Sequence, residues 1–212
     1  MTITIHDYWR SGAAWRVRIA LNLKGLDYAQ VPHNLRTGGQ RDPAYGAINP
    51  QALIPALEAD GAVLTQSLAI MEWLEETRPE PPLLPRDPLG RAHVRAMAAI
   101  VACDIHPLNN LRVLNSLRDD LGAGEGASHA WIARWIAPGF AALETMIARH
   151  GGLYAFGDTP TFADCCLVPQ VANALRFKVD LTPYPAICRV AETCAAHPAI
   201  AAAHAGLQPD AD

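Results

Sequence analysis

The sequence predicts a two-part protein, in which an α+β region is followed by an all-helical region. Strand-like and helix-like patterns alternate through about the first eighty residues. Five prolines then gather between Thr77 and Pro88, where neither a helix nor a sheet can continue. Every later segment repeats hydrophobic residues at helical spacing. We therefore expect one domain over residues 1–81 and a second over residues 88–212.

The first strand-like and helix-like segments meet at Ser11. Residues 2–7 alternate like a strand, and residues 13–24 form an apolar helical face before Gly25 ends the helix. Ser11 therefore lies at a helix N-terminus, where free N–H groups and the helix dipole attract a thiolate, a phosphate or a carboxylate. Serine is also a common helix cap, so a purely structural role stays open. Arg10 beside it adds a second group that binds anions.

The rest of the first region predicts three more strands and a second helix. A short strand near residues 28–31 is followed by a polar, glycine-rich loop. Residues 52–58 and 62–65 are strand-like, and Asp60–Gly61 between them is a strong signal for a two-residue hairpin. Ser67 is then expected to cap a helix. The predicted order is βαβ, a loop, and ββα.

Helical spacing and one capping signal organise the second region. Residues 89–118 predict one long helical segment kinked at Pro107, and residues 129–149 predict another. Thr161 and Asp164 have the spacing of a capping box ahead of a third helix. Two weaker helices and a frayed tail complete the region, at residues 184–195, 198–205 and 208–212.

Composition excludes several classes of protein. The net charge is −4, and no Lys/Arg-rich stretch is present that would track nucleic-acid phosphates. No apolar run approaches membrane-spanning length, and the first residues lack a secretory pattern, so we expect a cytoplasmic protein with neither nucleic acid nor membrane as partner. An odd number of cysteines without metal-type spacing favours buried thiols over a disulfide framework or a metal site. The cysteines are Cys103, Cys165, Cys166, Cys188 and Cys194.

The predicted order of the first region is that of thioredoxin-like domains, which usually carry a redox thiol. No cysteine precedes Cys103, so a thiol acting beside Ser11 has to arrive on a bound molecule such as a glutathione-like peptide. Gln66–Ser67 offers an amide, a hydroxyl and free N–H groups for an α-carboxylate. The backbone at Ile54–Pro55 can pair with a peptide like an edge strand, particularly if the bond is cis. Taken singly, these features are also explained as a helix cap and a strand edge.

Several motifs together resemble those of zeta-class glutathione transferases. The similarity runs from about residue 3 to residue 205, and the string at 15–21 is specific to that class. The motifs are Trp9–Gly12, Trp15–Leu21, Asn49–Pro50, Ile54–Pro55, Gln66–Ile70 and the Thr161 capping box. Three further segments more narrowly resemble bacterial glutathione-dependent maleylpyruvate isomerases, beside which maleylacetoacetate isomerases form a neighbouring branch. They are Cys103–Asn110, Phe156–Thr161 and Val179–Pro185.

The resemblance implies a glutathione transferase fold, a homodimer, and glutathione as the cofactor. Its glutathione contacts fall on Ser11, Gln40, Ile54, Gln66, Ser67, His106 and the segment from Asn110 to Arg112. Ser11 matches the hydroxyl that faces the sulfur. Relatives commonly have further hydroxyl or thiol side chains after this serine, whereas this chain has Gly12, Ala13 and Ala14. The backbone amides of Gly12 and Ala13 remain as donors.

Three residues of the helical region have open roles when judged from the residues alone. His106 and Asn110 lie one helical turn apart in a polar patch, and a structural role near the kink is open for the histidine. Arg176 has the position of a solvated cation at a helix C-terminus. The resemblance instead implies that His106 and Asn110 bind glutathione and that Arg176 faces the substrate.

The implied reaction is the cis–trans isomerisation of a maleyl-type enone diacid by thiolate addition, bond rotation and elimination. Both maleylpyruvate and maleylacetoacetate fit as substrates. The catalytic candidates are Ser11, Arg10 and Arg176, with the two arginines binding carboxylate and enolate oxygens. Two alternatives stay open: a general glutathione transferase that conjugates small electrophiles such as halogenated acids, and a non-catalytic transferase-like binding protein.

Overall fold

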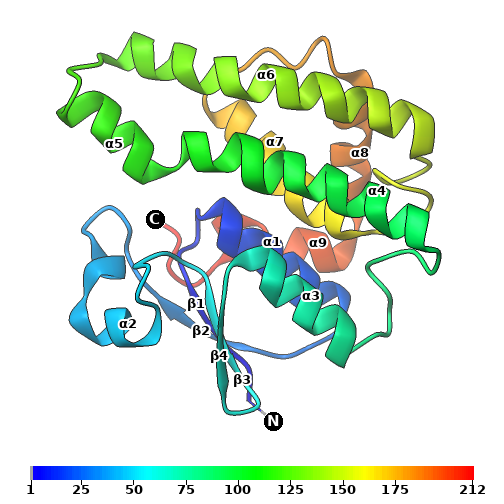
Figure 1. Cartoon of the computed structure of the whole chain (residues 1–212), viewed down its shortest axis with the longest axis horizontal. Helices are drawn as coiled ribbons and strands as arrows, with labels where there is room; N and C mark the ends of the chain where they lie inside the picture. Colours follow the sequence, from blue (N-terminus) through cyan, green and yellow to red (C-terminus); the bar gives the residue numbers. More distant parts are fainter. Residues whose placement is uncertain (1) are drawn as a thin grey trace. The chain divides into compact units, whose positions relative to one another are not determined.

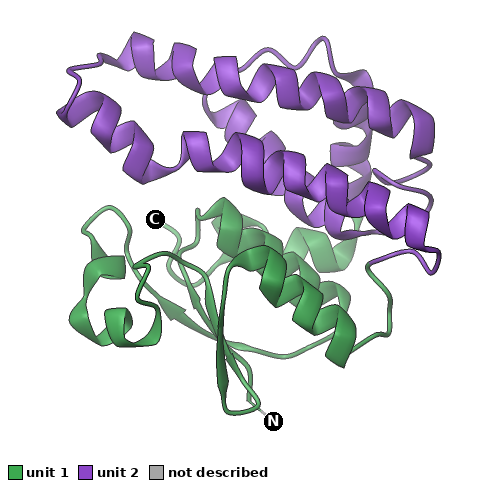
Figure 2. Cartoon of the chain, viewed as in Figure 1, with its two compact units in different colours: residues 1–83, 195–212 green, residues 84–194 purple. Residues whose placement is uncertain are grey.

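The chain folds into two compact units. We describe residues 2–212 in a computed structural model. Unit 1 comprises Met1–Leu83 and Ala195–Asp212, and unit 2 comprises Leu84–Cys194 (Figure 2). The sequence placed all residues after 88 in the helical domain, whereas the structure groups the C-terminal segment with unit 1.

Unit 1 is built on a four-stranded mixed sheet. The strand order is β2-β1-β3-β4, in which β1 runs parallel to β2 and antiparallel to β3, and β3 and β4 form a hairpin. The strands are β1 (Thr4–Asp7), β2 (Ala29–Pro32), β3 (Ala56–Ala59) and β4 (Ala62–Thr65). Asp60 and Gly61 both have positive φ, at 54° and 78°, as the predicted two-residue hairpin requires.

Helices pack beside this sheet and complete the predicted βαβ-ββα order. They are α1 (Gly12–Leu23), α2 (Pro43–Ile48), α3 (Ser67–Thr77) and α9 (Pro198–Ala202), with short 3₁₀ turns η1 (Gly39–Arg41) and η4 (Ala205–Leu207). Helix α1 contacts both α3 and α9 (Figure 1). The buried faces of α1 and α3 carry Val17, Ile19, Leu21, Ile70 and Leu74. The thioredoxin-like prediction for this region is confirmed.

Helix α2 was missed by the sequence prediction, which read this stretch as part of a loop. Its signals are nevertheless present, because the Asp42 side chain accepts a hydrogen bond from Ala44 N and Pro43 occupies the first turn. Tyr45 anchors the helix, since it is only 1% exposed and its hydroxyl donates to the carbonyl of Leu53 at 2.6 Å. One buried aromatic residue is too little to make a helical pattern in a six-residue helix.

Unit 2 is helical, as predicted, but its first segment is interrupted more widely than a single kink. Its elements are α4 (Pro88–Ala99), the π-helical η2 (Ile100–Ile105), the 3₁₀ turn η3 (His106–Asn109), α5 (Leu111–Asp119), α6 (Glu125–His150), α7 (Phe162–Arg176) and α8 (Pro185–Ala196). Pro107 supplies no backbone N–H. The side chain of Ile105 packs directly on Gly139 of α6. A Cβ atom at position 139 would overlap the Ile105 side chain. The interruption of the α-helix extends over the whole of η2 and η3.

The C-terminal tail is attached to unit 1, so the prediction that it frays is wrong. Gln208 is 8% exposed. Its side-chain amide donates to the carbonyls of Ala202 and His204, at 3.2 and 2.7 Å, and its oxygen accepts from Gln30 Nε2 at 3.0 Å. These partners help to explain why residues 195–212 group with unit 1, because Gln30 of β2 contacts the tail directly.

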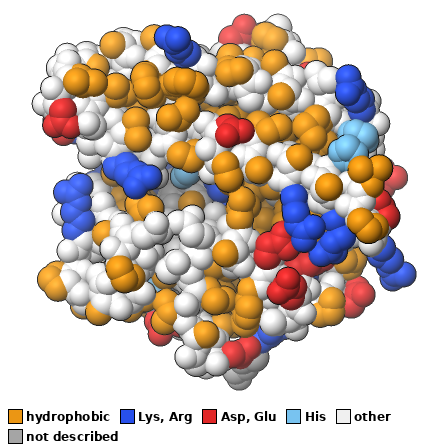
Figure 3. Space-filling model, viewed as in Figure 1, with side chains coloured by type: hydrophobic (Ala, Val, Ile, Leu, Met, Phe, Trp, Pro, Cys, Tyr) orange, Lys and Arg blue, Asp and Glu red, His pale blue; other side chains and the backbone are white. Residues whose placement is uncertain are grey.

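Surface charge, helix apolarity and cysteine burial can be compared with what the composition predicts. On the face of the described residues drawn in Figure 3, Lys and Arg side chains are separated by hydrophobic and acidic ones and form no continuous stripe. None of the helices formed by residues 2–212 has the length and apolarity needed to cross a membrane. Cys165, Cys166 and Cys194 are buried, Cys188 is half-buried, and Cys103 is exposed.

The predicted capping box at the start of α7 is confirmed. Asp164 is fully buried, and its two oxygens accept hydrogen bonds from the backbone of Ala155 at 2.8 Å and from the backbone and hydroxyl of Thr161 at 2.8 and 2.9 Å. Burial raises the pKa of this carboxyl, and these hydrogen bonds oppose the rise. Asp164 therefore ties the 155–161 loop to the first turn of α7.

Replacing Asp164 by alanine is expected to lower the free energy of unfolding by about 3 kcal/mol, because three buried donors lose their acceptor. Denaturant unfolding of Asp164→Ala and of the parent protein measures the change. The control is Asp119→Ala, which removes an exposed carboxylate paired with Arg118 and should unfold like the parent protein. If the two variants lost equal stability, the buried network would not have the role assigned to it.

Candidate active site

The N-terminus of α1 forms the centre of the candidate site. Ser11 is the N-cap residue and is half-buried, and its Oγ accepts a hydrogen bond from Ala14 N at 3.2 Å. A hydroxyl accepts through its lone pairs and still has one proton to donate. Helix geometry also leaves the amides of Gly12 and Ala13 without intrahelical acceptors. Capping and anion binding are therefore compatible roles for Ser11.

Arg10 adds positive charge at the same helix end. Its guanidinium carbon lies 4.9 Å from the centre of the Trp9 ring, a cation–π contact that restrains the side chain. No carboxylate among residues 2–212 forms an ion pair with Arg10. The guanidinium thus keeps its capacity to bind an anionic group.

The N-terminus of α3 carries a second polar group of side chains. Gln66 has a positive φ of 67°, and its amide donates to Gln51 Oε1 at 2.6 Å. The sequence predicted that Ser67 caps this helix, but Gln66 takes the N-cap position without a side-chain cap bond, and Ser67 is the first helical residue. Ser67 Oγ instead accepts a hydrogen bond from Arg16 Nη1 at 3.3 Å. The Ser67 hydroxyl retains its own proton for a ligand at the start of α3.

Arg16 is a feature of this site that sequence reasoning missed. The residue is 2% exposed, its Nε has no hydrogen-bond partner, and none of the described carboxylates pairs with it. A buried cation without a counter-ion is unfavourable, so an anion beside Ser67 would stabilise it. Arg16 lies within the apolar run of α1, and only its presence in that run hinted at burial.

Two further predicted residues of unit 1 have distinct environments. The Ile54–Pro55 peptide bond is cis, and Ile54 is 8% exposed in a cluster with Tyr8, Tyr45 and Ala56. Gln40 lies in η1, and its Oε1 is a buried acceptor without a partner. An unpartnered buried acceptor is unfavourable unless a ligand donates to it.

The predicted residues of unit 2 lie at helix ends. His106 is half-buried at the start of η3. Asn110 caps α5, and its side-chain oxygen accepts from Arg112 N at 3.1 Å, while the Arg112 side chain is exposed. Neighbouring Asn109 is 9% exposed, yet both polar atoms of its side chain lack partners. Arg176 is exposed in the last turn of α7, with its guanidinium 4.9 Å from the centre of the Phe177 ring.

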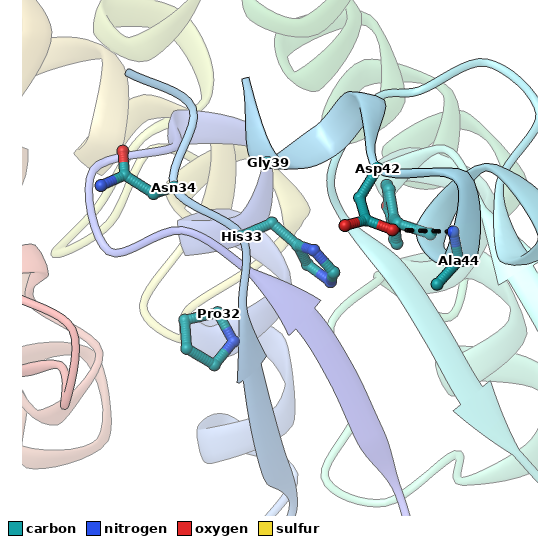
Figure 4. Close-up of a pocket in the computed structure, with 7 residues that line it drawn as sticks. Pro32, His33, Asn34, Gly39, Asp42 and Ala44 are labelled. Atoms are coloured by element: carbon teal, nitrogen blue, oxygen red, sulfur yellow. Dashed lines mark hydrogen bonds between the residues drawn. The ribbon is translucent and has the colours of Figure 1, made fainter. Parts of the chain in front are cut away.

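A pocket of about 360 Å³ lies elsewhere in unit 1 (Figure 4). It is lined by Pro32, His33, Asn34, Gly39, Asp42, Ala44 and Tyr45, and so by none of the predicted site residues. His33 Nε2 lies 2.9 Å from His6 Nδ1, and His6 Nε2 lies 2.7 Å from Glu58 Oε1. Burial and the neighbouring His6 lower the pKa of His33. The contacts from His33 through His6 to Glu58 link the pocket wall to strands β1 and β3. They do not involve the N-terminal residues of α1 and α3 described above. Among residues 2–212, no cluster of His, Cys, Asp and Glu is arranged to hold a metal.

Comparison with known proteins identifies relatives along nearly the whole chain. The family model described as the glutathione S-transferase N-terminal domain matches residues 10–77, and that of the C-terminal domain matches residues 129–205. A maleylpyruvate isomerase from a Ralstonia species is 52% identical over 97% of this chain and 98% of its own length. A maleylacetoacetate isomerase from Pseudomonas aeruginosa is 52% identical over 97% of each chain.

Solved structures extend the similarity to the fold. The holo structure of a maleylpyruvate isomerase, described as a bacterial zeta-class glutathione S-transferase, has a TM-score of 0.97 at 51% identity and covers 99% of this chain and 100% of its own. A maleylacetoacetate isomerase from Anaeromyxobacter dehalogenans, solved with glutathione bound in its active site, has a TM-score of 0.90 at 47% identity. That alignment covers 100% of this chain and 98% of the other.

Proposed function

The chain belongs to the zeta class of the glutathione transferase family, and we propose that it is a glutathione-dependent cis–trans isomerase of a maleyl-type enone diacid. The observation that carries the proposal is the N-terminus of α1, where a half-buried serine hydroxyl and two amides meet an unpaired arginine. Such a helix end stabilises an anionic sulfur.

The residues of unit 1 fit glutathione at several points. Ser11, Gly12 and Ala13 supply donors at the end of α1 for the thiolate. Gln66 and Ser67 supply an amide, a hydroxyl and helix N–H groups for the α-carboxylate, and the buried Arg16 adds positive charge behind Ser67.

Two other positions in unit 1 support the same fit. The unpartnered acceptor of Gln40 is suited to an N–H of the peptide, and the backbone at Ile54 is suited to peptide pairing. We therefore assign the thiolate, the α-carboxylate and the peptide backbone of glutathione to contacts in unit 1.

Each catalytic candidate has a role that follows from its chemistry. When bound, glutathione supplies the thiolate that adds to the double bond and leaves after the bond has rotated. Ser11 donates its hydroxyl proton to the thiolate without transferring it, and so lowers the thiol pKa. Arg10 neutralises a carboxylate or enolate oxygen near the end of α1. We assign Arg176 to a substrate carboxylate, and we propose that unit 2 binds the substrate.

Residues of unit 2 complete the proposal for the cofactor and the assembly. We assign His106, Asn110 and Arg112 to glutathione binding. The cap that Asn110 provides uses its side-chain oxygen, and its amide protons can still be donated to a ligand. We further propose a homodimer in the cytoplasm, from the resemblance to the family.

The relatives named above act on two related substrates, and either one is a candidate here. Maleylpyruvate and maleylacetoacetate share the enone diacid end that the arginines would bind. Assays of both compounds with this protein would show which of them it isomerises. A protein that conjugates glutathione would consume one equivalent per turnover, and a non-catalytic binding protein would turn over neither compound.

The proposed function predicts isomerisation that requires glutathione and does not consume it. Loss of the enone absorbance of each substrate is followed with and without a catalytic amount of glutathione, and free thiol is titrated at the end. We expect many turnovers per glutathione and an unchanged thiol concentration. Full turnover without glutathione, or thiol loss equal to product formed, would contradict the proposal.

A second prediction concerns Arg176. If it binds a substrate carboxylate, Arg176→Ala should lower kcat/KM for the diacid. The expected loss of transition-state stabilisation is about 2 to 4 kcal/mol, with little change in glutathione affinity. Arg176→Lys keeps the charge but not the planar guanidinium, so it should restore only part of the loss.

Arg134→Ala is the matched control for Arg176→Ala. It also removes an exposed arginine stacked on the next residue's ring, here Trp135 at 5.9 Å. Steady-state kinetics of the three variants measure the effect. Normal diacid kinetics in Arg176→Ala, or an equal loss in Arg134→Ala, would show that Arg176 is not a substrate ligand.

A further inference from the structure

The short loop between β1 and α1 is held on both sides of one residue, Trp9. Its backbone N–H donates to Asp210 Oδ2 at 3.0 Å, and its carbonyl accepts from Arg18 Nη2 at 2.9 Å. Ser11 N closes the loop by donating to the carbonyl of Tyr8 at 2.8 Å. The position of the loop therefore depends on two side chains, Arg18 of the adjoining helix α1 and Asp210 of the C-terminal tail.

The carbonyl side of Trp9 is anchored by a buried ion pair. Arg18 Nη1 lies 2.7 and 2.6 Å from the two oxygens of Asp7, and the two side chains are 0% and 1% exposed. Asp7 also accepts from Tyr8 N at 2.6 Å. This anchor belongs to β1 and α1, the two elements that the loop joins.

The amide side of Trp9 is anchored by the C-terminal tail instead. Gln208 fixes the tail through Gln30 and two backbone carbonyls, and Asp210 follows two residues later. None of the described cations forms an ion pair with Asp210. Its carboxylate instead accepts a hydrogen bond from the backbone N–H of Trp9, which lies 201 positions earlier in the chain.

Trp9 in turn determines where the next two residues lie. The Arg10 guanidinium stacks on the Trp9 ring at 4.9 Å, and Ser11 follows as the cap of α1. A displacement of the Trp9 backbone therefore moves both the arginine and the hydroxyl. Small displacements of catalytic groups lower rates strongly, because reacting groups must be held in a narrow range of geometry.

We propose that Asp210 is a positioning residue, through which the C-terminal tail holds the Arg10–Ser11 segment in its active geometry. The inference rests on the proposed function, since it assigns the consequence to a glutathione thiol beside Ser11. Asp210 touches no reacting group itself. It acts by restraining the amide of Trp9.

Asp210→Ala tests the proposal in the full-length protein. We expect kcat to fall about tenfold and the pKa of bound glutathione's thiol to rise by about half to one unit, since one charge-assisted hydrogen bond to the loop is lost. The KM for glutathione should stay within about twofold, because Gln66 and Ser67 are untouched. Hydrogen exchange of the Trp9 amide should accelerate.

Two variants separate the contact from general effects of charge. Asp210→Asn keeps a carbonyl acceptor for Trp9 N, so its kcat should stay within about threefold of the parent value. Asp212→Ala is the matched control, since it removes a carboxylate from the same tail that pairs with Arg36 at 2.5 Å on the surface. It should behave like the parent protein.

Several results would overturn the proposal. They are an Asp210→Ala variant with parental kcat and thiol pKa, an Asp210→Asn variant as impaired as Asp210→Ala, and an Asp212→Ala variant impaired to the same extent. Failure of the proposed function is recognised separately, because the parent protein would then lack isomerase activity. In that case the exchange rate of the Trp9 amide still decides whether Asp210 positions the loop.

Discussion

The buried ion pair between Asp7 and Arg18 is the interaction on which the arrangement of the site depends. It joins the end of β1 to the buried face of α1, and Arg18 also holds the carbonyl of Trp9 in the loop between them. Burying two charges is unfavourable unless their remaining hydrogen-bonding groups are satisfied. Here the Asp7 carboxylate also accepts hydrogen bonds from Tyr8 N and Gln30 Nε2. The ion pair can therefore orient the loop while the remaining acceptor positions of Asp7 are satisfied.

Two helix N-termini in unit 1 carry the donors that we assign to glutathione. The end of α1 offers the Ser11 hydroxyl and two amides, and the end of α3 offers Gln66 and Ser67 with Arg16 buried behind. A thiolate and a carboxylate are the two groups of glutathione that such ends stabilise best. In the proposed assignment, this pairing lets a thioredoxin-like domain with no cysteine before Cys103 use the thiol of a bound glutathione.

Local sequence signals predicted most of the elements, whereas they could not reveal contacts between residues far apart in the chain. The Asp60–Gly61 hairpin and the Thr161 capping box follow from residues adjacent in sequence. The burial of Arg16 and the fixed position of Gln208 do not, because their partners lie 51 and 178 residues away. Hydrophobic periodicity treats a charged or amide side chain as exposed, so such residues are assigned to the surface until the fold is known. The roles of the site residues remain predictions.

The claim that the end of α1 ionises a bound thiol is tested most directly by titrating glutathione on the protein. Thiolate absorbance is followed against pH for free glutathione, for the parent complex and for Ser11→Ala. The account predicts a thiol pKa below the free value of about 8.5 to 9 in the parent complex and a rise of about one unit on loss of the hydroxyl. A parent complex whose thiol titrates at the same pH as free glutathione would contradict it.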